Sequence, residues 1–275
     1  MTRPASSPFA LSRRSALLGL LSAPLACRSG TQSAPPSASV TASAAASPGV
    51  PVLEVVQVTH MRADERGGVA VVLLHGFGAQ GDDLVSLARS LMRPGTRFIL
   101  PAAPLSLGNG GRAWWRLDAS DRPPYVTDVT DAADSAAHTL TRNAELEAAR
   151  GAVQAVLRRT KEQYAPEQLF MVGFSQGAML ALDVALAAAP PVQRVAVLSG
   201  ALLTDAAAQT AALHALRPAV FISHGREDTR LPFSGAERMK TELEQRGLDV
   251  TWLPFSGGHE IPEAVVTELR TFLFG

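Results

Sequence analysis

The chain has 275 residues, of which 47% are hydrophobic, and it carries 25 Lys and Arg residues against 25 Asp and Glu residues. A chain of this length and apolar content can bury one large core, and α/β domains of this size are often undivided. The balanced charge gives no indication of a nucleic-acid partner. Cys27 is the single cysteine, which excludes an intramolecular disulfide.

The first 26 residues have the pattern of an export signal. Arg3, Arg13 and Arg14 precede an apolar stretch over residues 16–26, and no acidic residue occurs before Glu54. The apolar stretch is too short to span a bilayer as a stable helix. The arginine pair and its neighbours, residues 12–17, resemble the twin-arginine export signal of bacteria.

A second export feature ends at the cysteine. The sequence Pro24-Leu25-Ala26-Cys27 resembles a lipoprotein cleavage box, in which the cysteine is lipidated and becomes the mature N-terminus, although Pro24 stands where leucine is usual. We therefore expect a protein of the bacterial cell envelope, attached to a membrane through lipidated Cys27. The alternative is a periplasmic or secreted protein, cleaved near Ala26, with a free thiol at Cys27.

Residues 27–50 consist almost entirely of Ser, Ala, Pro, Thr and Gly. A segment of this composition has little apolar surface to bury and is typical of a disordered tether. The folded domain is therefore expected over residues 51–275.

This domain alternates strand patterns with helical patterns. Apolar runs of strand length occur at 52–58, 69–74, 97–100, 169–172, 195–198, 220–224 and 250–253, and helical patterns at 82–92, 140–163, 178–188, 234–245 and 262–274. The inner strands are near-continuous apolar runs, as expected of strands covered on both sides. The order predicts a single-domain α/β fold, with a mainly parallel central sheet and helices on both faces.

The loop after residues 69–74 contains His75, Phe77 and Gly78. Glycines just beyond a buried strand allow backbone N–H groups to converge, and one of two oxyanion donors can come from such a loop. We assign this donor to the N–H of Phe77, with Gly78 as the alternative. His75 is expected to fix the loop through hydrogen bonds rather than to act as a base.

A glycine-serine turn follows the strand expected at 169–172. The sequence Gly173-Phe174-Ser175-Gln176-Gly177 lies between that strand and a helical stretch, the context in which G-x-S-x-G marks a nucleophilic serine. The two glycines allow a tight turn with Ser175 at its apex. The N–H of Gln176, at the start of the helix, would point to where an oxyanion could form. The alternative is a surface turn without a chemical role.

Two later loops supply a carboxylate and a histidine. Asp228, beyond the strand at 220–224, can accept the Nδ1–H of a histidine and fix its tautomer, and the adjacent Glu227 remains a possible substitute. His224 is expected to be structural. His259 precedes the last expected helix and can reach across the sheet to Ser175. The order Ser175, Asp228, His259 is that of an α/β-hydrolase.

These motifs together resemble the phospholipase/carboxylesterase family, which includes bacterial carboxylesterases and acyl-protein thioesterases. The resemblance covers roughly residues 69–275. It implies that Ser175 is the nucleophile, His259 the base and Asp228 the acid of a catalytic triad. The matching segments are residues 74–78 (LHGFG), 101–104 (PAAP) with Trp114 and Trp115, 173–178 (GFSQGA), 224–232 (HGREDTRLP) and 258–262 (GHEIP).

The resemblance implies a serine carboxylic-ester hydrolase that acts on small or acyl esters through an acyl-enzyme, without a metal or an organic cofactor. Thioesterase or lysophospholipase activity is the alternative within the family. A further alternative is a non-catalytic binding protein of the same fold, although such a protein has no use for Ser, His and Asp together. A peptidase of this fold usually adds a propeller or cap domain, for which the chain has no room. Neither the natural substrate nor the oligomeric state is indicated by the sequence.

An apolar acyl pocket is expected near Ser175. Its candidate lining residues are Phe77, Gly78, Leu105, Leu107, Trp114 and Trp115. The alternative is that the two tryptophans simply cap the core.

Overall fold

The structure is a computed structural model that describes residues 37–41, 51–108, 110–117, 144–187, 191–203 and 217–275. The described residues all belong to one unit of the chain, Pro35–Gly275. The expected export signal, its Cys27 and most of the expected tether lie outside the described residues.

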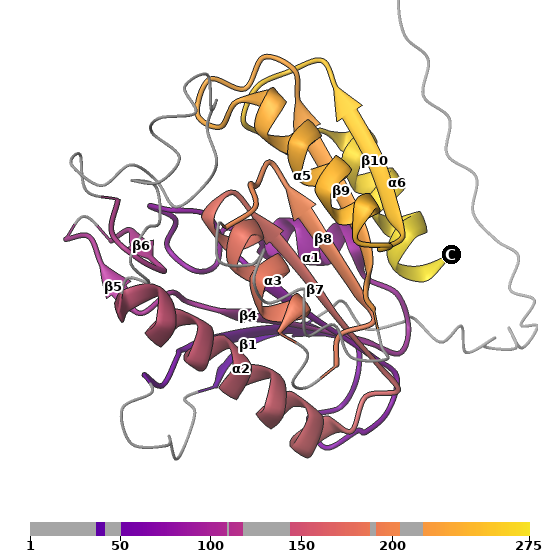
Figure 1. Cartoon of the computed structure of the whole chain (residues 1–275). Coiled ribbons are helices and arrows are strands. Elements are labelled where there is room, and N and C mark those ends of the chain that lie inside the picture. The colour runs from indigo at the N-terminus through magenta and orange to yellow at the C-terminus, as the bar shows by residue number, and fades with distance from the viewer. Residues whose placement is uncertain (1–36, 42–50, 109, 118–143, 188–190, 204–216) are drawn as a thin grey trace, which may run out of the picture. The chain divides into compact units, whose positions relative to one another are not determined.

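An eight-stranded sheet in the order β1-β2-β4-β3-β7-β8-β9-β10 forms the centre of the fold (Figure 1). The six strands β4, β3, β7, β8, β9 and β10 are parallel to one another, whereas β2 runs antiparallel to both of its neighbours, β1 and β4. The strands are β1 (Ser37–Thr41), β2 (Val55–Thr59), β3 (Val69–Leu74), β4 (Thr96–Pro101), β7 (Gln168–Phe174), β8 (Arg194–Leu198), β9 (Ala219–Gly225) and β10 (Val250–Phe255).

Helices cover both faces of this sheet (Figure 1). Because successive strand residues point to opposite faces, each inner strand contributes to two separate cores. Met171 of β7 belongs to the core under α2, α3 and α5, whereas Phe170 and Val172 belong to the core under α1 and α6. The helices are α1 (Val85–Leu91), α2 (Ala144–Tyr164), α3 (Gln176–Leu186), α5 (Phe233–Gln245) and α6 (Glu263–Phe274).

The seven strands and five helices expected from the sequence are all present, with ends that differ by a few residues. The structure adds a two-stranded sheet of β5 (Leu105–Ser106) and β6 (Arg112–Ala113), which the sequence analysis does not predict. Strands of two residues are too short to produce an alternating pattern. None of the described helices is both long and apolar enough to cross a membrane.

The structure differs from the expected tether at Ser37–Thr41, which form β1. This segment pairs antiparallel with Val55–Thr59 of β2. Without β1, the outer edge of β2 would present a row of unpaired backbone N–H and C=O groups. Pairing with that edge accounts for a strand in a segment whose composition alone predicts disorder.

Candidate active site

The carboxyl ends of the parallel strands form one edge of the sheet, and the loops that leave it carry the candidate residues. His75 follows β3, Ser175 follows β7, Asp228 lies three residues beyond β9, and His259 follows β10. In open α/β sheets, this edge is where ligands bind. The loops that carry the candidate residues therefore meet at the carboxyl edge of the sheet.

The turn between β7 and α3 holds Ser175 in an uncommon conformation, with φ 55° and ψ −121°. Two glycines make this turn sterically possible. A Cβ atom on Gly173 would lie 2.3 Å from the carbonyl oxygen of Gly177, and one on Gly177 would lie 2.2 Å from the carbonyl oxygen of Leu74. The sequence G-x-S-x-G is thus required by the close approach of β3, β7 and α3.

Ser175, His259 and Asp228 form an unbroken line of hydrogen-bonding groups. Ser175 Oγ lies 2.8 Å from His259 Nε2, and His259 Nδ1 lies 2.7 Å from Asp228 Oδ2. The His259 ring also packs against Phe174, with ring centroids 5.0 Å apart. These distances suit an imidazole that donates Nδ1–H to the carboxylate and accepts the serine proton at Nε2.

The Asp228 carboxylate is fixed from both sides. Its Oδ1 accepts the backbone N–H groups of Arg230 at 2.8 Å and Leu231 at 3.0 Å. Burial alone would raise the pKa of Asp228, but the N–H of Leu231, the His259 ring and the N–H of Arg230 outweigh it, so that the pKa lies below its ordinary value. The carboxylate is therefore held in its charged form.

Glu227, the possible substitute for Asp228, has a different role in the structure. Its side chain is exposed, and its backbone N–H donates to the carbonyl of Gly257 at 2.9 Å. This bond ties the loop that carries Asp228 to the loop that carries His259. The structure thus brings Asp228, and not Glu227, against His259.

Two buried histidines support the loops, in agreement with the structural roles expected for them. The Nδ1–H of His75 donates to the carbonyl of Gly76 at 2.8 Å, and its Nε2 accepts the N–H of Ala103 at 2.9 Å. His224 Nε2 lies 2.9 Å from the carbonyl of Leu231 and 3.2 Å from Asp228 Oδ2. Burial lowers the pKa of both histidines, which favours their neutral form.

Backbone hydrogen bonds distinguish the two candidate oxyanion donors of the loop after β3. The N–H of Gly78 donates to the carbonyl of Arg112 at 2.8 Å and is not available to a ligand. Within the described part of the chain, no acceptor is found for the N–H of Phe77 or for that of Gln176. This geometry favours Phe77 over Gly78.

The side chain of Gln176 has a contact that the sequence analysis missed. Its Oε1 accepts the backbone N–H of Trp114 at 2.9 Å, and its Nε2 donates to the carbonyl of Trp115 at 2.8 Å. It thereby joins the start of α3 to the segment after β6. The sequence carries no signal for this contact, because 61 and 62 positions separate the partners.

A pocket of about 370 Å³ opens beside Ser175 and His259. Of the residues expected to line an acyl pocket, Phe77 and Trp115 line this one, whereas Gly78, Leu105, Leu107 and Trp114 are not among its described lining residues. Trp114 is fully buried, with its Nε1–H donating to the carbonyl of His75 at 2.9 Å, so that it belongs to the core. The lining consists of Gly76, Phe77, Trp115, Leu117, Phe174, Ser175, Gln176, Met179, Arg230, Leu231 and His259.

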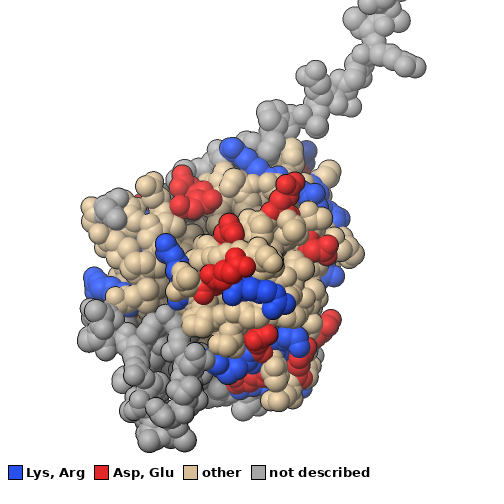
Figure 2. Space-filling model, turned by 90° about the horizontal axis from the view of Figure 1, so that it is seen from above, with Lys and Arg blue, Asp and Glu red and all other residues tan. Residues whose placement is uncertain are grey.

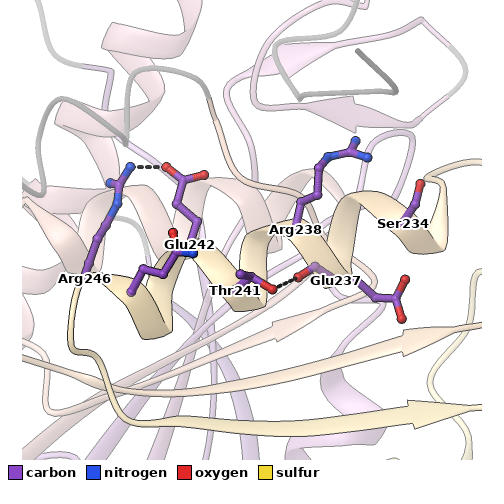
Figure 3. Close-up of a pocket in the computed structure, with 7 residues that line it drawn as sticks. Ser234, Glu237, Arg238, Thr241, Glu242 and Arg246 are labelled. Carbon is purple, nitrogen blue, oxygen red and sulfur yellow. Dashed lines mark hydrogen bonds and ion pairs between the residues drawn. The ribbon is translucent and has the colours of Figure 1, made fainter. Parts of the chain in front are cut away.

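A second hollow, of about 650 Å³, follows the outer side of α5 (Figure 3). Its described wall comes from this helix and Arg246, and Glu242 and Arg246 pair with each other there (Figure 3). None of the triad residues lines it. Among the described residues, no group of three or more His, Cys, Asp or Glu side chains is arranged to hold a metal ion.

The parallel sheet, the strained serine turn and the carboxyl-edge loops define the chain as an α/β-hydrolase. The family model described as Phospholipase/Carboxylesterase matches residues 57–274, and the chain belongs to that family. It is accordingly an enzyme of the serine hydrolase class that acts on ester substrates. Comparison with curated protein sequences gives no match.

Solved structures agree with this assignment. Esterase PE8 is 29% identical, with a TM-score of 0.66, and the match covers 81% of this chain and 98% of that one. A phospholipase/carboxylesterase from Dyadobacter fermentans is 21% identical (TM-score 0.60; 82% and 98% covered), and acyl-protein thioesterase 2 from Zea mays is 20% identical (TM-score 0.55; 80% and 96% covered). The latter two similarities show the fold.

Proposed function

We propose that this protein hydrolyses carboxylic esters through an acyl-enzyme formed on Ser175. The observation that carries this proposal is the line of hydrogen-bonding groups from Ser175 Oγ through His259 to Asp228, at 2.8 and 2.7 Å, at the edge of an apolar pocket. The same three groups in the same order of contacts perform acyl transfer on several unrelated folds.

In the proposed mechanism, Ser175 Oγ attacks the carbonyl carbon of the ester while His259 Nε2 takes its proton. Asp228 stabilises the imidazolium that forms and keeps Nδ1 protonated. When the tetrahedral intermediate collapses, His259 returns the proton to the departing alkoxide, and an alcohol leaves. A water molecule then repeats these steps on the acyl-enzyme and releases the acid.

The oxyanion of each tetrahedral intermediate is proposed to bind the N–H groups of Phe77 and Gln176. Support for this pair comes from the absence of acceptors for both N–H groups among the described residues and from the bond that occupies the N–H of Gly78. Loss of one oxyanion donor costs about 3 kcal/mol in comparable sites.

The proposal is tested by hydrolysis of 4-nitrophenyl esters of increasing acyl length by the purified chain, beside Ser175→Ala. We expect turnover by the wild type, none above background in the variant, and the same circular dichroism and melting temperature for both. A matched series of acyl thioesters separates ester from thioester preference. Absence of turnover from a folded wild type on every ester and thioester would favour the alternative of a binding protein.

We also propose that the protein is exported and lipidated at Cys27. The support is the sequence alone: paired arginines, a short apolar stretch and a cysteine at the expected cleavage box. Labelled palmitate should enter the wild type in a bacterial host and not a Cys27→Ser variant, and globomycin should block processing of the precursor. Normal processing under globomycin would contradict lipidation.

A further inference from the structure

Arg230 stands out among the residues that line the pocket beside Ser175. Among the described lining residues, only Arg230 and His259 have an ionisable side chain, whereas Phe77, Trp115 and Leu117 are among the apolar ones. The backbone N–H of Arg230 donates to Asp228 Oδ1 at 2.8 Å. The contact fixes the backbone of Arg230 next to the triad while its side chain remains exposed.

The guanidinium of Arg230 has no carboxylate partner within the described part of the chain. Two other arginines near this edge of the sheet, Arg112 and Arg116, do have carboxylate partners. Arg112 lies 3.4 Å from Glu54, and Arg116 lies 2.5 Å from Glu145. An arginine at the wall of an apolar pocket, without a carboxylate partner among the described residues, is free to bind an anion that comes from outside.

Trp115 provides a second donor in the same lining. Its side chain is buried, and its Nε1–H has no hydrogen-bond acceptor among the described residues. A buried donor without an acceptor is uncommon in folded proteins and often indicates a missing ligand or water. Arg230 therefore supplies the accessible donors of this lining, and an anionic group on the substrate would pair with them, whereas the Nε1–H of Trp115 is itself buried.

The chemistry of these donors defines the ligand. A guanidinium binds carboxylate and phosphate groups through paired N–H donors, and the apolar lining suits a hydrocarbon chain. We propose that the preferred substrate is an ester with an anionic carboxylate or phosphate group close to the scissile bond, and that Arg230 selects this group. The inference rests on the proposed ester hydrolysis and adds the substrate class to it.

The test compares charged and neutral esters of matched shape. Mono-4-nitrophenyl glutarate and 4-nitrophenyl pentanoate differ by a carboxylate at the end of the acyl chain. 1-Butyrylglycerol 3-phosphate and 1-butyrylglycerol differ by a phosphate in the leaving group. For each pair, the quantity measured is the ratio of kcat/KM for the charged ester to that for the neutral one.

We expect the wild type to prefer the charged ester in at least one pair, and Arg230→Gln to lower that ratio about tenfold, mainly through KM. Arg230→Lys should retain part of the preference, because it keeps the charge without the paired donors. Raising the salt concentration from about 0.02 M to about 0.5 M should lower the ratio for the wild type and leave the ratio for Arg230→Gln unchanged. The pair that responds identifies whether the anion belongs to the acyl or the leaving group.

Arg226→Gln is the matched control. Arg226 belongs to the same loop and is exposed, but its guanidinium lies over the ring of Phe233, 4.9 Å from the centroid, and it does not line the pocket. The kcat/KM ratios of Arg226→Gln should equal those of the wild type for both pairs of esters. Ratios that are unchanged in Arg230→Gln for both pairs would overturn the inference while leaving ester hydrolysis intact. If no ester is hydrolysed, or if Ser175→Ala retains turnover, both proposals fail.

Discussion

Asp228 has four contacts at once, and the two contacts of Oδ2 depend on its being a carboxylate. Oδ1 accepts two backbone N–H groups, whereas Oδ2 faces His259 Nδ1 at 2.7 Å and His224 Nε2 at 3.2 Å. An amide in place of the carboxylate can present an N–H to His259 and favour the wrong tautomer of the ring.

We therefore predict that Asp228→Asn lowers kcat for ester hydrolysis by a factor on the order of 10⁴. Glu227→Gln, one position earlier, should change kcat less than about twofold, because the role of Glu227 is a backbone bond to Gly257 that the variant keeps. Steady-state kinetics of both variants on one 4-nitrophenyl ester measure the difference. A severe loss in Glu227→Gln with a mild one in Asp228→Asn would reverse the assignment of the acid.

Two adjacent tryptophans show how far the position of a single side chain can be predicted from the sequence. Trp114 and Trp115 are next to each other, yet only Trp115 lines the pocket, because the Nε1–H of Trp114 donates to the carbonyl of His75. The convergence of Ser175, His259 and Asp228 was predictable, since these residues follow recognisable strands and glycine turns. The pocket was predictable only in part: Met179 and Arg230 line it because of where α3 and the loop after β9 lie, which no local pattern reveals.

At the level of elements, the side chain of Gln176 connects the serine turn to the segment after β6. We predict that Gln176→Leu lowers the free energy of unfolding by about 3 kcal/mol, because it leaves the N–H of Trp114 and the carbonyl of Trp115 without partners. Gln176→Glu keeps an acceptor for Trp114 but places a carboxylate oxygen against the carbonyl of Trp115, and it should also destabilise the fold. Chemical denaturation of both variants provides the comparison, and equal stability of Gln176→Leu and the wild type would refute the role of this contact.

A buried ion pair joins α2 to the helix that begins after Ser175. Arg150 Nε lies 2.5 Å from Asp183 Oδ2, its second donor lies 2.9 Å from Oδ1, and both side chains are nearly inaccessible. Arg150 also pairs with Glu147 at 2.5 Å, but the Glu147 side chain is partly exposed, so removing Asp183 leaves the buried guanidinium only partly compensated. Asp183→Asn should therefore cost about 3 to 5 kcal/mol of stability.

The matched control for this ion pair replaces both charges. Arg150→Met with Asp183→Leu removes both buried charges and leaves only the partly exposed Glu147, and exchanges of this kind are often neutral in stability. We expect the double variant to be more stable than Asp183→Asn in the same denaturation experiment. If it is less stable, the contribution of the ion pair exceeds the cost of burying it.

The order of elements was predictable because each long strand and helix has its own apolar periodicity. β3 begins and ends where the sequence pattern places it, at Val69 and Leu74. β1, β5 and β6 were not predictable. β5 and β6 have two residues each, and β1 owes its conformation to a partner strand rather than to its composition.

At the scale of the whole molecule, charges of both signs are interspersed on the face seen in Figure 2, as expected from equal numbers of acidic and basic residues. Neither sign forms a continuous field among the residues described on that face. The stability of the fold should therefore respond to pH mainly through its buried ionisable groups.

His75 and His224 determine the direction in which stability changes with pH. Because burial lowers their pKa in the folded state, the unfolded chain takes up protons below about pH 6.5 that the folded chain does not. The free energy of unfolding should thus fall between pH 7 and pH 5, by at most about 1.4 kcal/mol per pH unit for each histidine. Urea denaturation at several pH values in this range measures the free energy of unfolding. Its dependence on pH should be weaker for His75→Gln than for the wild type. The same pH dependence in both proteins would show that His75 does not contribute to the loss of stability at low pH.

Covalent labelling tests the central claim, a nucleophilic Ser175, without assuming a substrate. The folded wild type is treated with a fluorophosphonate, the adduct is weighed by intact mass spectrometry, and the modified peptide is sequenced. We predict one adduct per chain, on Ser175, with none in Ser175→Ala and much slower labelling in His259→Ala. Labelling at another residue, or no labelling of a folded wild-type protein, would contradict this account of the site.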